Sequence, residues 1–323
     1  MKLVSIDARP SVRTGLIVGS EVLDFALARD ILPIAGWVPA AMPDLLAGGE
    51  AGVKVIRSLI DQIGPGRADV ETRLRQSGAL KPFDDVPLAP PVPRPGIVLS
   101  HGRAYHSHIK EMDSEWMAKE KEPKAFMKNV NSIVGPGAPI LLPLQCGDMV
   151  DFEGEFSIVF GAHCHNVGEE DAMSMVAGYT IVNDVSARDW VENFMQTKDP
   201  DLNRMGKQLP SFTPMGPVIV TKDEIPDPHD LTLTTTLNDR VMQSAHTSDL
   251  RWRIPALISF FSRWYCFRPG DVLTTGSPAG VGYGRKPPVF MKHGDIVAIT
   301  VSGVGTLANP VREMQGTQDF VRN

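Results

Sequence analysis

Three acidic residues with alternating spacing form the first group in this sequence that could do chemistry. In the segment DFEGEFSIVFG, Asp151, Glu153 and Glu155 occupy every second position. Side chains of a β-strand alternate between two faces, so these carboxylates would share one face, about 6–7 Å apart along the strand. The apolar stretch that follows indicates burial, and buried carboxylates repel one another unless a cation compensates them. Oxygen ligands suit Mg²⁺ or Mn²⁺, with Ca²⁺ as a further candidate. The alternative interpretation is a solvated strand face without an ion.

A fourth acid, Asp184, closes another apolar strand. The segment GYTIVNDVSARD passes from an apolar stretch into Asn183 and Asp184 and then reaches Arg188. A carboxylate at the end of a buried strand needs a partner. Two interpretations stay open, because Asp184 could pair with Arg188 or could be a third ligand of the metal ion.

His108 and Glu111 form a candidate proton-transfer pair. If the chain is helical from Tyr105 to about Lys119, these two side chains lie three positions apart on one helix face and can hydrogen-bond. A carboxylate that holds an imidazole selects its tautomer and raises its basicity, which a water-activating general base requires. The alternative is an ordinary surface pair.

A glycine-rich loop follows the strand signal DVLTT. It contains Gly276, Gly280, Gly282 and Gly284, and it lacks the GK[ST] ending of a nucleotide phosphate loop. Backbone N–H groups in such a turn can bind a carboxylate or an enolate oxygen. A cluster of plain β-turns is the alternative.

Strand signals dominate the chain after residue 95, and they would position these groups. The segments GIVLS, DFEGEFSIVFG, GYTIVNDVS, GPVIVT, LTLTTTLND, DVLTTG and DIVAITVSG are rich in Val, Ile and Thr and are separated by turn signals. Only three stretches there have helical spacing, at about 105–119, 169–176 and 254–264. We therefore expect an α+β, mostly-β domain that is rolled or barrel-like.

A proline-rich stretch separates this domain from a smaller N-terminal unit. Six prolines fall between Pro82 and Pro95, which is typical of a semi-rigid extended connector. Before it, TGLIVGSEVLDF predicts a hairpin around Gly19, and apolar residues at helical spacing in 49–64 predict a helix. We expect a small N-terminal α/β domain over 1–80, a linker over 81–95 and a catalytic domain over 96–323.

Composition excludes several classes of protein. The 323 residues carry a net charge of −6, and the isoelectric point is near 5.8, which argues against a nucleic-acid partner. The chain has no run of about 18 apolar residues and no signal-peptide pattern, so we expect no membrane partner and no secretion. Three cysteines without C-x-x-C spacing fit a reducing cytoplasm.

Six motifs follow one another between residues 102 and 282. G-x-N-Y-x-x-H-x-x-E is matched at Gly102, Tyr105, His108 and Glu111, with Ala104 in place of Asn, and F-x-K-x-x-x-S is matched at Phe126, Lys128 and Ser132. D-[YF]-E-x-E is matched at 151–155, and G-Y-x-x-x-N-D-x-S-A-R-D at 178–189, with Val191 where a Gln can stand. A lysine seven residues before P-x-G-P is matched at Lys207, and T-G-T-P-x-G-V-G at 275–282, with Ser277 in place of Thr. In this order of motifs the sequence resembles the fumarylacetoacetate hydrolase family over roughly residues 96–312.

The resemblance implies a mixed β-roll that forms homodimers and a bound Mg²⁺ or Mn²⁺ ion. It makes Glu153, Glu155 and Asp184 the metal ligands and places Asp151 behind them. It puts His108 and Glu111 on a short lid helix over the substrate, with Lys207 as a further catalytic residue. It implies that Tyr105, Arg188, Gly276 and Ser277 bind the substrate.

For the reaction, the resemblance favours hydrolytic C–C cleavage of a 2,4-dioxo acid such as maleylpyruvate or fumarylpyruvate, in aromatic catabolism. In this interpretation His108, oriented by Glu111, activates the water, and the metal ion with Lys207 stabilises the departing pyruvate enolate. Oxaloacetate decarboxylation, and tautomerisation or hydration of 2-hydroxydienoates, are the alternatives on the same template. A non-enzymatic binding or structural member would be expected to have damaged ligand positions, and the three are intact.

Overall fold

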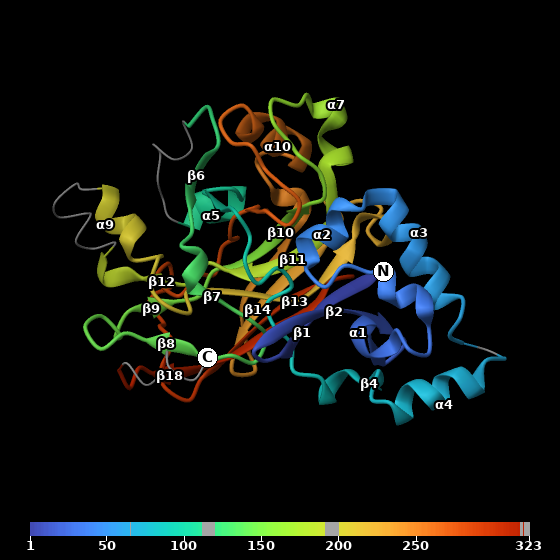
Figure 1. Cartoon of the computed structure of the whole chain (residues 1–323). Coiled ribbons are helices and arrows are strands. Elements are labelled where there is room, and N and C mark those ends of the chain that lie inside the picture. Colours follow the sequence, from blue (N-terminus) through green and yellow to red (C-terminus); the bar gives the residue numbers. More distant parts are fainter. Residues whose placement is uncertain (65, 112–119, 191–199, 317–318, 320–323) are drawn as a thin grey trace.

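The computed structural model describes the whole chain except residues 65, 112–119, 191–199, 317–318 and 320–323 (Figure 1). Its largest sheet has eleven strands within the described residues. Their order is β4 (Leu80–Pro82), β3 (Glu21–Asp24), β2 (Ser11–Val18), β1 (Lys2–Ala8), β13 (Thr213–Thr221), β11 (Val176–Asn183), β10 (Gly154–Phe160), β16 (Val272–Thr274), β5 (Val98–Gly102) and β6 (Lys124–Met127), with β7 (Ile133–Val134) beside β13.

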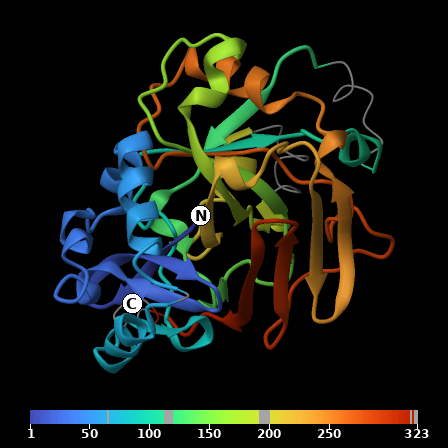
Figure 2. The same ribbon diagram turned by 90° about the vertical axis from the view of Figure 1, so that its right-hand side faces the viewer.

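A second sheet has five strands, and Figure 2 shows its red and orange strands to the right of the blue N-terminal strands. Its order is β15 (Arg240–His246), β14 (Thr232–Leu237), β17 (Ile296–Val301), β18 (Gly305–Glu313) and β8 (Ile140–Leu142). Two short strands, β9 (Val150–Asp151) and β12 (Ser186–Ala187), pair with each other. The expected mostly-β fold is confirmed, and no sheet in the described part of the chain closes into a barrel.

Helices cover the faces and ends of the sheets. The α-helices are α1 (Phe25–Ala28), α2 (Met42–Ala47), α3 (Gly49–Ile60), α4 (Ala68–Gln76), α5 (His106–Glu111), α7 (Glu169–Ala172), α9 (Pro200–Met205) and α10 (Ile254–Ser262). Short 3₁₀ turns are η1 (Pro33–Trp37), η2 (Phe83–Asp85), η3 (Val130–Ser132), η4 (Met173–Met175), η5 (Lys222–Glu224) and η6 (Thr247–Asp249). No helix among the described residues is long and apolar enough to cross a membrane.

The predicted helices differ from the observed ones mainly at their ends. The helix expected over 169–176 stops at Ala172, passes through the η4 turn and becomes strand β11 at Val176. The helix expected over 254–264 is α10, and its apolar face is buried as the spacing predicts. The helix expected from Tyr105 begins at His106 as α5, and its predicted continuation to Lys119 lies outside the described residues.

Strand β10 shows how the sequence pattern divides the core. Phe156, Ile158 and Phe160 point into a core that also contains side chains of the five-stranded sheet and α10. Val159, which has the opposite parity, packs in a second core with the N-terminal helices. The alternation predicted for this segment is therefore confirmed, and β10 is buried on both faces.

The N-terminal unit continues the main sheet. Strand β1 pairs antiparallel with β13, with Lys2 opposite Val220, and the second core mixes N-terminal residues with Val182 and Val272. The predicted hairpin is present as β2–β3, and Gly19 at its turn has a φ of +61°. The proline-rich segment lies along β1, because the Ser5 hydroxyl donates to the Pro91 carbonyl oxygen. The boundaries 1–80, 81–95 and 96–323 stay a prediction.

Candidate metal centre and active site

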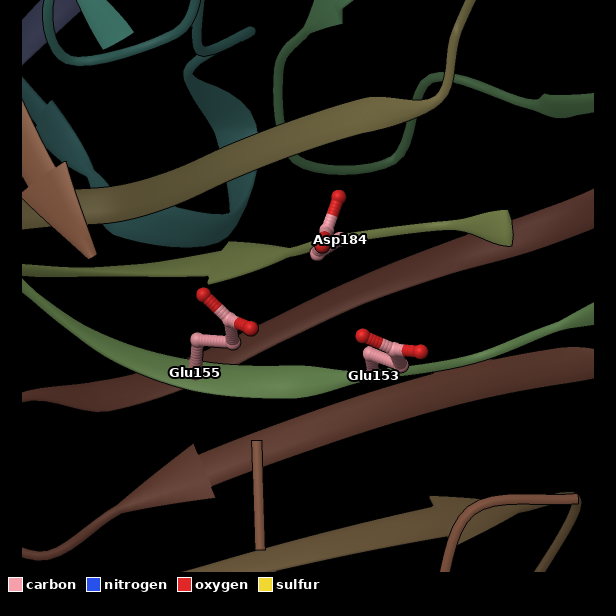
Figure 3. A group of neighbouring side chains, drawn as sticks. All are labelled: Glu153, Glu155 and Asp184. Carbon is pink, nitrogen blue, oxygen red and sulfur yellow. The ribbon is translucent and has the colours of Figure 1, made fainter. Parts of the chain in front are cut away.

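Two neighbouring strands bring three carboxylates together. Glu155 lies on β10, Glu153 lies just before that strand, and Asp184 directly follows β11. The pairing of Gly154 with Asn183 sets Asp184 across from Glu153, and the Asp184 N–H donates to the Glu153 carbonyl oxygen at 2.9 Å. One oxygen from each carboxylate lies within 4.8 Å of the others, and all three residues are buried. Figure 3 shows the three side chains on their two neighbouring segments. The alternative of a solvated acidic face is therefore wrong.

Two buried lysines pair with Asp184. Lys207 Nζ donates to Asp184 Oδ2 at 2.6 Å and to Glu153 Oε2 at 2.9 Å. Lys128 Nζ donates to Asp184 Oδ1 at 2.6 Å and to the Phe212 carbonyl oxygen at 3.0 Å. Burial disfavours both ammonium groups. At Lys207 the charges of Asp184 and Glu153 outweigh the effect of burial, so the pKa of Lys207 is raised. At Lys128 burial dominates, so the pKa of Lys128 is lowered.

Arg188 pairs with other acids, so the interpretation that it neutralises Asp184 is wrong. Its Nε donates to Asp151 Oδ2 at 2.9 Å, and its Nη2 donates to Glu153 Oε1 at 2.5 Å. The chain turns after Asp184 into β12, which pairs with β9, and Arg188 directly follows β12, which places its guanidinium beside Asp151. Asp151 also accepts from the Gly282 N–H at 2.7 Å, so it connects Arg188 to the glycine loop.

Glu155 contributes a buried oxygen to the carboxylate cluster. Its Oε2 is buried and has no hydrogen-bond partner among the described residues. Burial, together with the nearby charges of Asp184 and Glu153, raises the pKa of Glu155 well above its ordinary value. An unpaired carboxylate oxygen facing two further carboxylates is a donor set that a hard divalent cation prefers. The residues present therefore fit Mg²⁺ or Mn²⁺.

The His108–Glu111 pair lies on α5 as the spacing predicts. His108 Nδ1 lies 3.3 Å from Glu111 Oε2, and both side chains are largely buried. Glu111 Oε1 accepts from the Gly280 N–H at 2.9 Å, so the same carboxylate holds the histidine and contacts the glycine loop. The same loop also holds Asp151, which accepts from the Gly282 N–H at 2.7 Å, so the His–Glu pair and Asp151 are fixed by neighbouring loop residues. The alternative of a solvated surface pair is wrong.

The glycine loop packs tightly against the start of α5. Gly276 has a φ of +85°, and a Cβ there would lie 2.5 Å from the Cβ of Ala104. Ser277 is buried, and its Oγ accepts a hydrogen bond from Gln243. Tyr105 is fully buried, and burial raises the pKa of its phenol. The substrate contacts expected of Tyr105, Arg188, Gly276 and Ser277 stay predictions.

Two residues of the site received no role from the sequence. The sequence assigns Lys128 only to a motif, and the half-exposed strand β6 (Lys124–Met127) that precedes it gives no signal of a buried cation. Gln243 had no local signal beyond an inward position on a strand, and only its tertiary contacts reveal it.

The comparisons with known proteins agree with this geometry. The model of the fumarylacetoacetate hydrolase C-terminal family matches residues 98–312. The chain belongs to this family. It is 35% identical to the mitochondrial oxaloacetate tautomerase fahd2 of Xenopus laevis, over 96% of this chain and 90% of that protein.

Two solved structures that are similar to this chain are named as hydrolases. A maleylpyruvate hydrolase from Sphingobium sp. SYK-6, in complex with manganese(II) and pyruvate, has a TM-score of 0.75 and 27% identity, with 98% of this chain and 100% of that chain covered. The fumarylacetoacetate hydrolase of Exiguobacterium antarcticum has a TM-score of 0.74 and 30% identity, with 97% and 100% covered. The protein is thus an enzyme of a family that includes hydrolases and tautomerases.

Proposed function

We propose that this enzyme uses a divalent metal ion to form an enolate from a short 2-oxo acid, and that it interconverts the keto and enol forms of oxaloacetate. The observation that carries this proposal is a buried cluster of three carboxylates together with a His–Glu pair that is held by the same glycine loop as the neighbouring Asp151. The relative from Xenopus laevis that matches 96% of the chain is named an oxaloacetate tautomerase, which supports the choice of substrate.

Glu153, Glu155 and Asp184 would hold the ion, either Mg²⁺ or Mn²⁺. When bound, a divalent cation stabilises negative charge that develops on the 2-oxo oxygen of a substrate. Lys207 lies against two of the same carboxylates, so its ammonium group adds positive charge at this place. The buried surroundings strengthen that electrostatic effect because little water screens it.

His108 would move the proton. Glu111 accepts at the Nδ1 side, so the neutral ring carries its proton on Nδ1 and leaves the Nε2 lone pair as the base. Nε2 takes a proton from C3 of the keto acid, the C–H electron pair forms the C2=C3 bond, and the carbonyl electrons move onto the 2-oxo oxygen. Return of the proton from the imidazolium to that oxygen completes the enol. Atoms and charges balance without a co-reactant.

Hydrolysis of an acylpyruvate is the second candidate. The similarity to maleylpyruvate hydrolase over 98% of the chain favours it. The same Nε2 would take the proton from a water that attacks the distal carbonyl carbon. The C–C bond then breaks, its electron pair passes to the pyruvate fragment as an enolate, and the other product is a carboxylic acid.

One experiment separates the two candidates. The protein, loaded with Mn²⁺ or Mg²⁺, is mixed with oxaloacetate and, separately, with a panel of acylpyruvates, while enol absorbance and pyruvate release are followed. Accelerated keto–enol exchange of oxaloacetate without pyruvate release supports the tautomerase. Release of pyruvate and an acid from an acylpyruvate supports the hydrolase, and pyruvate with CO₂ from oxaloacetate indicates decarboxylation. If neither substrate class reacts faster with the protein than without it, the proposal is refuted.

A further inference from the structure

Gln243 lies beside the carboxylate cluster although it belongs to the other sheet. It is on β15, paired with Thr235, and is 1% exposed. Its side chain contacts two places at the site: Oε1 accepts from the Gly154 N–H at 3.0 Å, and Nε2 donates to Ser277 Oγ at 2.7 Å and to the Pro278 carbonyl oxygen at 2.9 Å. Gly154 lies between the ligand candidates Glu153 and Glu155.

The Gln243 carboxamide bridges β10 and the segment after β16, where the backbone pairing of these two strands ends. Ser157 pairs with Thr274, and the Thr275 N–H still donates to the Phe156 carbonyl oxygen at 2.9 Å. Continued by two more residues, this register would set Ser277 level with Gly154, but β16 ends at Thr274. Gln243 replaces the missing backbone contact, because its amide accepts from one strand and donates to the other, as a peptide group would.

The contacts leave no choice of amide orientation. The oxygen must face the Gly154 N–H, which can only donate, and the nitrogen must face the Pro278 carbonyl, which can only accept. Ser277 Oγ therefore faces an N–H group and acts as an acceptor toward Gln243. Its own proton is then available to donate in another direction, and no other hydrogen bond of this hydroxyl occurs within the described chain.

We propose that Gln243 is a positioning residue that turns the Ser277 hydroxyl into a donor toward an anionic oxygen of the 2-oxo acid. The inference rests on the proposed function, since it assumes that such an acid binds beside Glu153 and Glu155. Gln243 acts through Ser277 and does not itself touch the ligand. A donor fixed in advance loses little entropy when it meets a carboxylate or an enolate oxygen.

Binding of pyruvate to the Mn²⁺-loaded protein tests this inference. Calorimetric titrations at saturating Mn²⁺ compare the wild type with Gln243→Met, Gln243→Glu, Ser277→Ala and the double variant Gln243→Met/Ser277→Ala. A lost hydrogen bond to a charged oxygen weakens binding by about tenfold or more. We expect this loss for each single variant and no further loss in the double variant, because both changes remove the same donor.

Gln243→Glu keeps an acceptor for the Gly154 N–H and nearly the same shape, so it covers the case in which Gln243→Met does not fold. The serine hydroxyl would then donate to the new carboxylate, and pyruvate should again bind about tenfold more weakly. Ser277→Thr retains a hydroxyl, so pyruvate binding by this variant should depend on Gln243 as it does in the wild type. Ser244→Ala, an exposed neighbour on β15, is the matched control and should bind pyruvate like the wild type.

The binding measurements distinguish failure of the role of Gln243 from failure of the proposed function. Wild-type affinity in both Gln243 variants, or losses that multiply to about a hundredfold in the double variant, would overturn the role of Gln243 while leaving the proposed function intact. If the wild-type protein with Mn²⁺ does not bind pyruvate at all, the 2-oxo acid site of the proposed function is refuted, and the inference falls with it.

Discussion

Replacing Glu155 by Gln should separate metal binding from folding. In the metal-free protein, Glu155 Oε2 is buried without a hydrogen-bond partner among the described residues, and burial and two neighbouring carboxylates raise the pKa of this group. Gln has nearly the shape of the protonated side chain and carries no charge. The substitution should therefore cost the metal-free protein no stability, but it should remove a ligand of the ion.

The expected stabilisation by the metal ion follows from the thermodynamic linkage between ion binding and folding. A ligand at 100 times its Kd stabilises the folded state by about 2.7 kcal/mol. For 323 residues, an unfolding entropy of about 0.7 kcal/mol per kelvin converts this into a rise in Tm of about 4 °C. We expect calorimetric scans of the wild type to show this rise with Mn²⁺ relative to EDTA. Glu155→Gln should show no rise, and the exposed Glu169→Gln should behave as the wild type does.

Glu155→Gln should also change how the stability of the folded protein depends on pH. A carboxyl group with a raised pKa in the folded state favours folding at low pH, and this contribution is lost as the pH rises above the unfolded value of 4.5 and through the higher folded pKa. Glu155→Gln lacks this loss. In EDTA, the Tm of Glu155→Gln should therefore rise relative to the Tm of the wild type as the pH rises, by at most about 2 °C per pH unit. A variant that melts more than about 2 °C below the wild type in EDTA at pH 7, or that keeps the Mn²⁺ shift, would refute this reasoning.

Three further substitutions probe other parts of the site. His108→Asn should lower kcat for the substrate by about 10²–10⁴-fold, because it removes the base. Its Mn²⁺ affinity, measured by titration calorimetry, should not change, and an unchanged kcat would exclude His108 as the base. Arg188→Met should destabilise the fold by about 3–5 kcal/mol in denaturant titrations, because it leaves the buried carboxylate of Asp151 without its cation; a loss below about 1 kcal/mol would contradict the pairing. Gly276→Ala should cost more stability than Gly19→Ala in the same titrations. Both residues have a positive φ, which costs about 1–2 kcal/mol for alanine, but only at Gly276 would the new Cβ also collide with a neighbouring side chain, and equal losses would disprove that collision.

The site was partly accessible from the sequence because some of its order is local. The alternation Asp151, Glu153, Glu155 follows from strand geometry, and the spacing of His108 and Glu111 follows from helix geometry. Both patterns place side chains on a common face without any knowledge of the fold. The partner of Asp184 could not be derived in this way. Arg188 is four residues away in sequence, yet the turn into β12 carries it toward Asp151. Lys128 and Lys207 pair with Asp184 instead.

The sequence by itself determined the mostly-β class, the common strand face of Asp151, Glu153 and Glu155, the His–Glu pair and the family. These depend on periodicity and on motifs that span a few residues. Only the tertiary structure decided that the N-terminal strands extend the main sheet, since Lys2 pairs with Val220, and that Lys128, Lys207 and Arg188 divide the acids among them. It also decided that Gln243 bridges Gly154 and the glycine loop, although it lies 89 residues from Gly154 in the chain. Such contacts depend on how the two sheets pack against each other, and no local pattern in the chain encodes that packing.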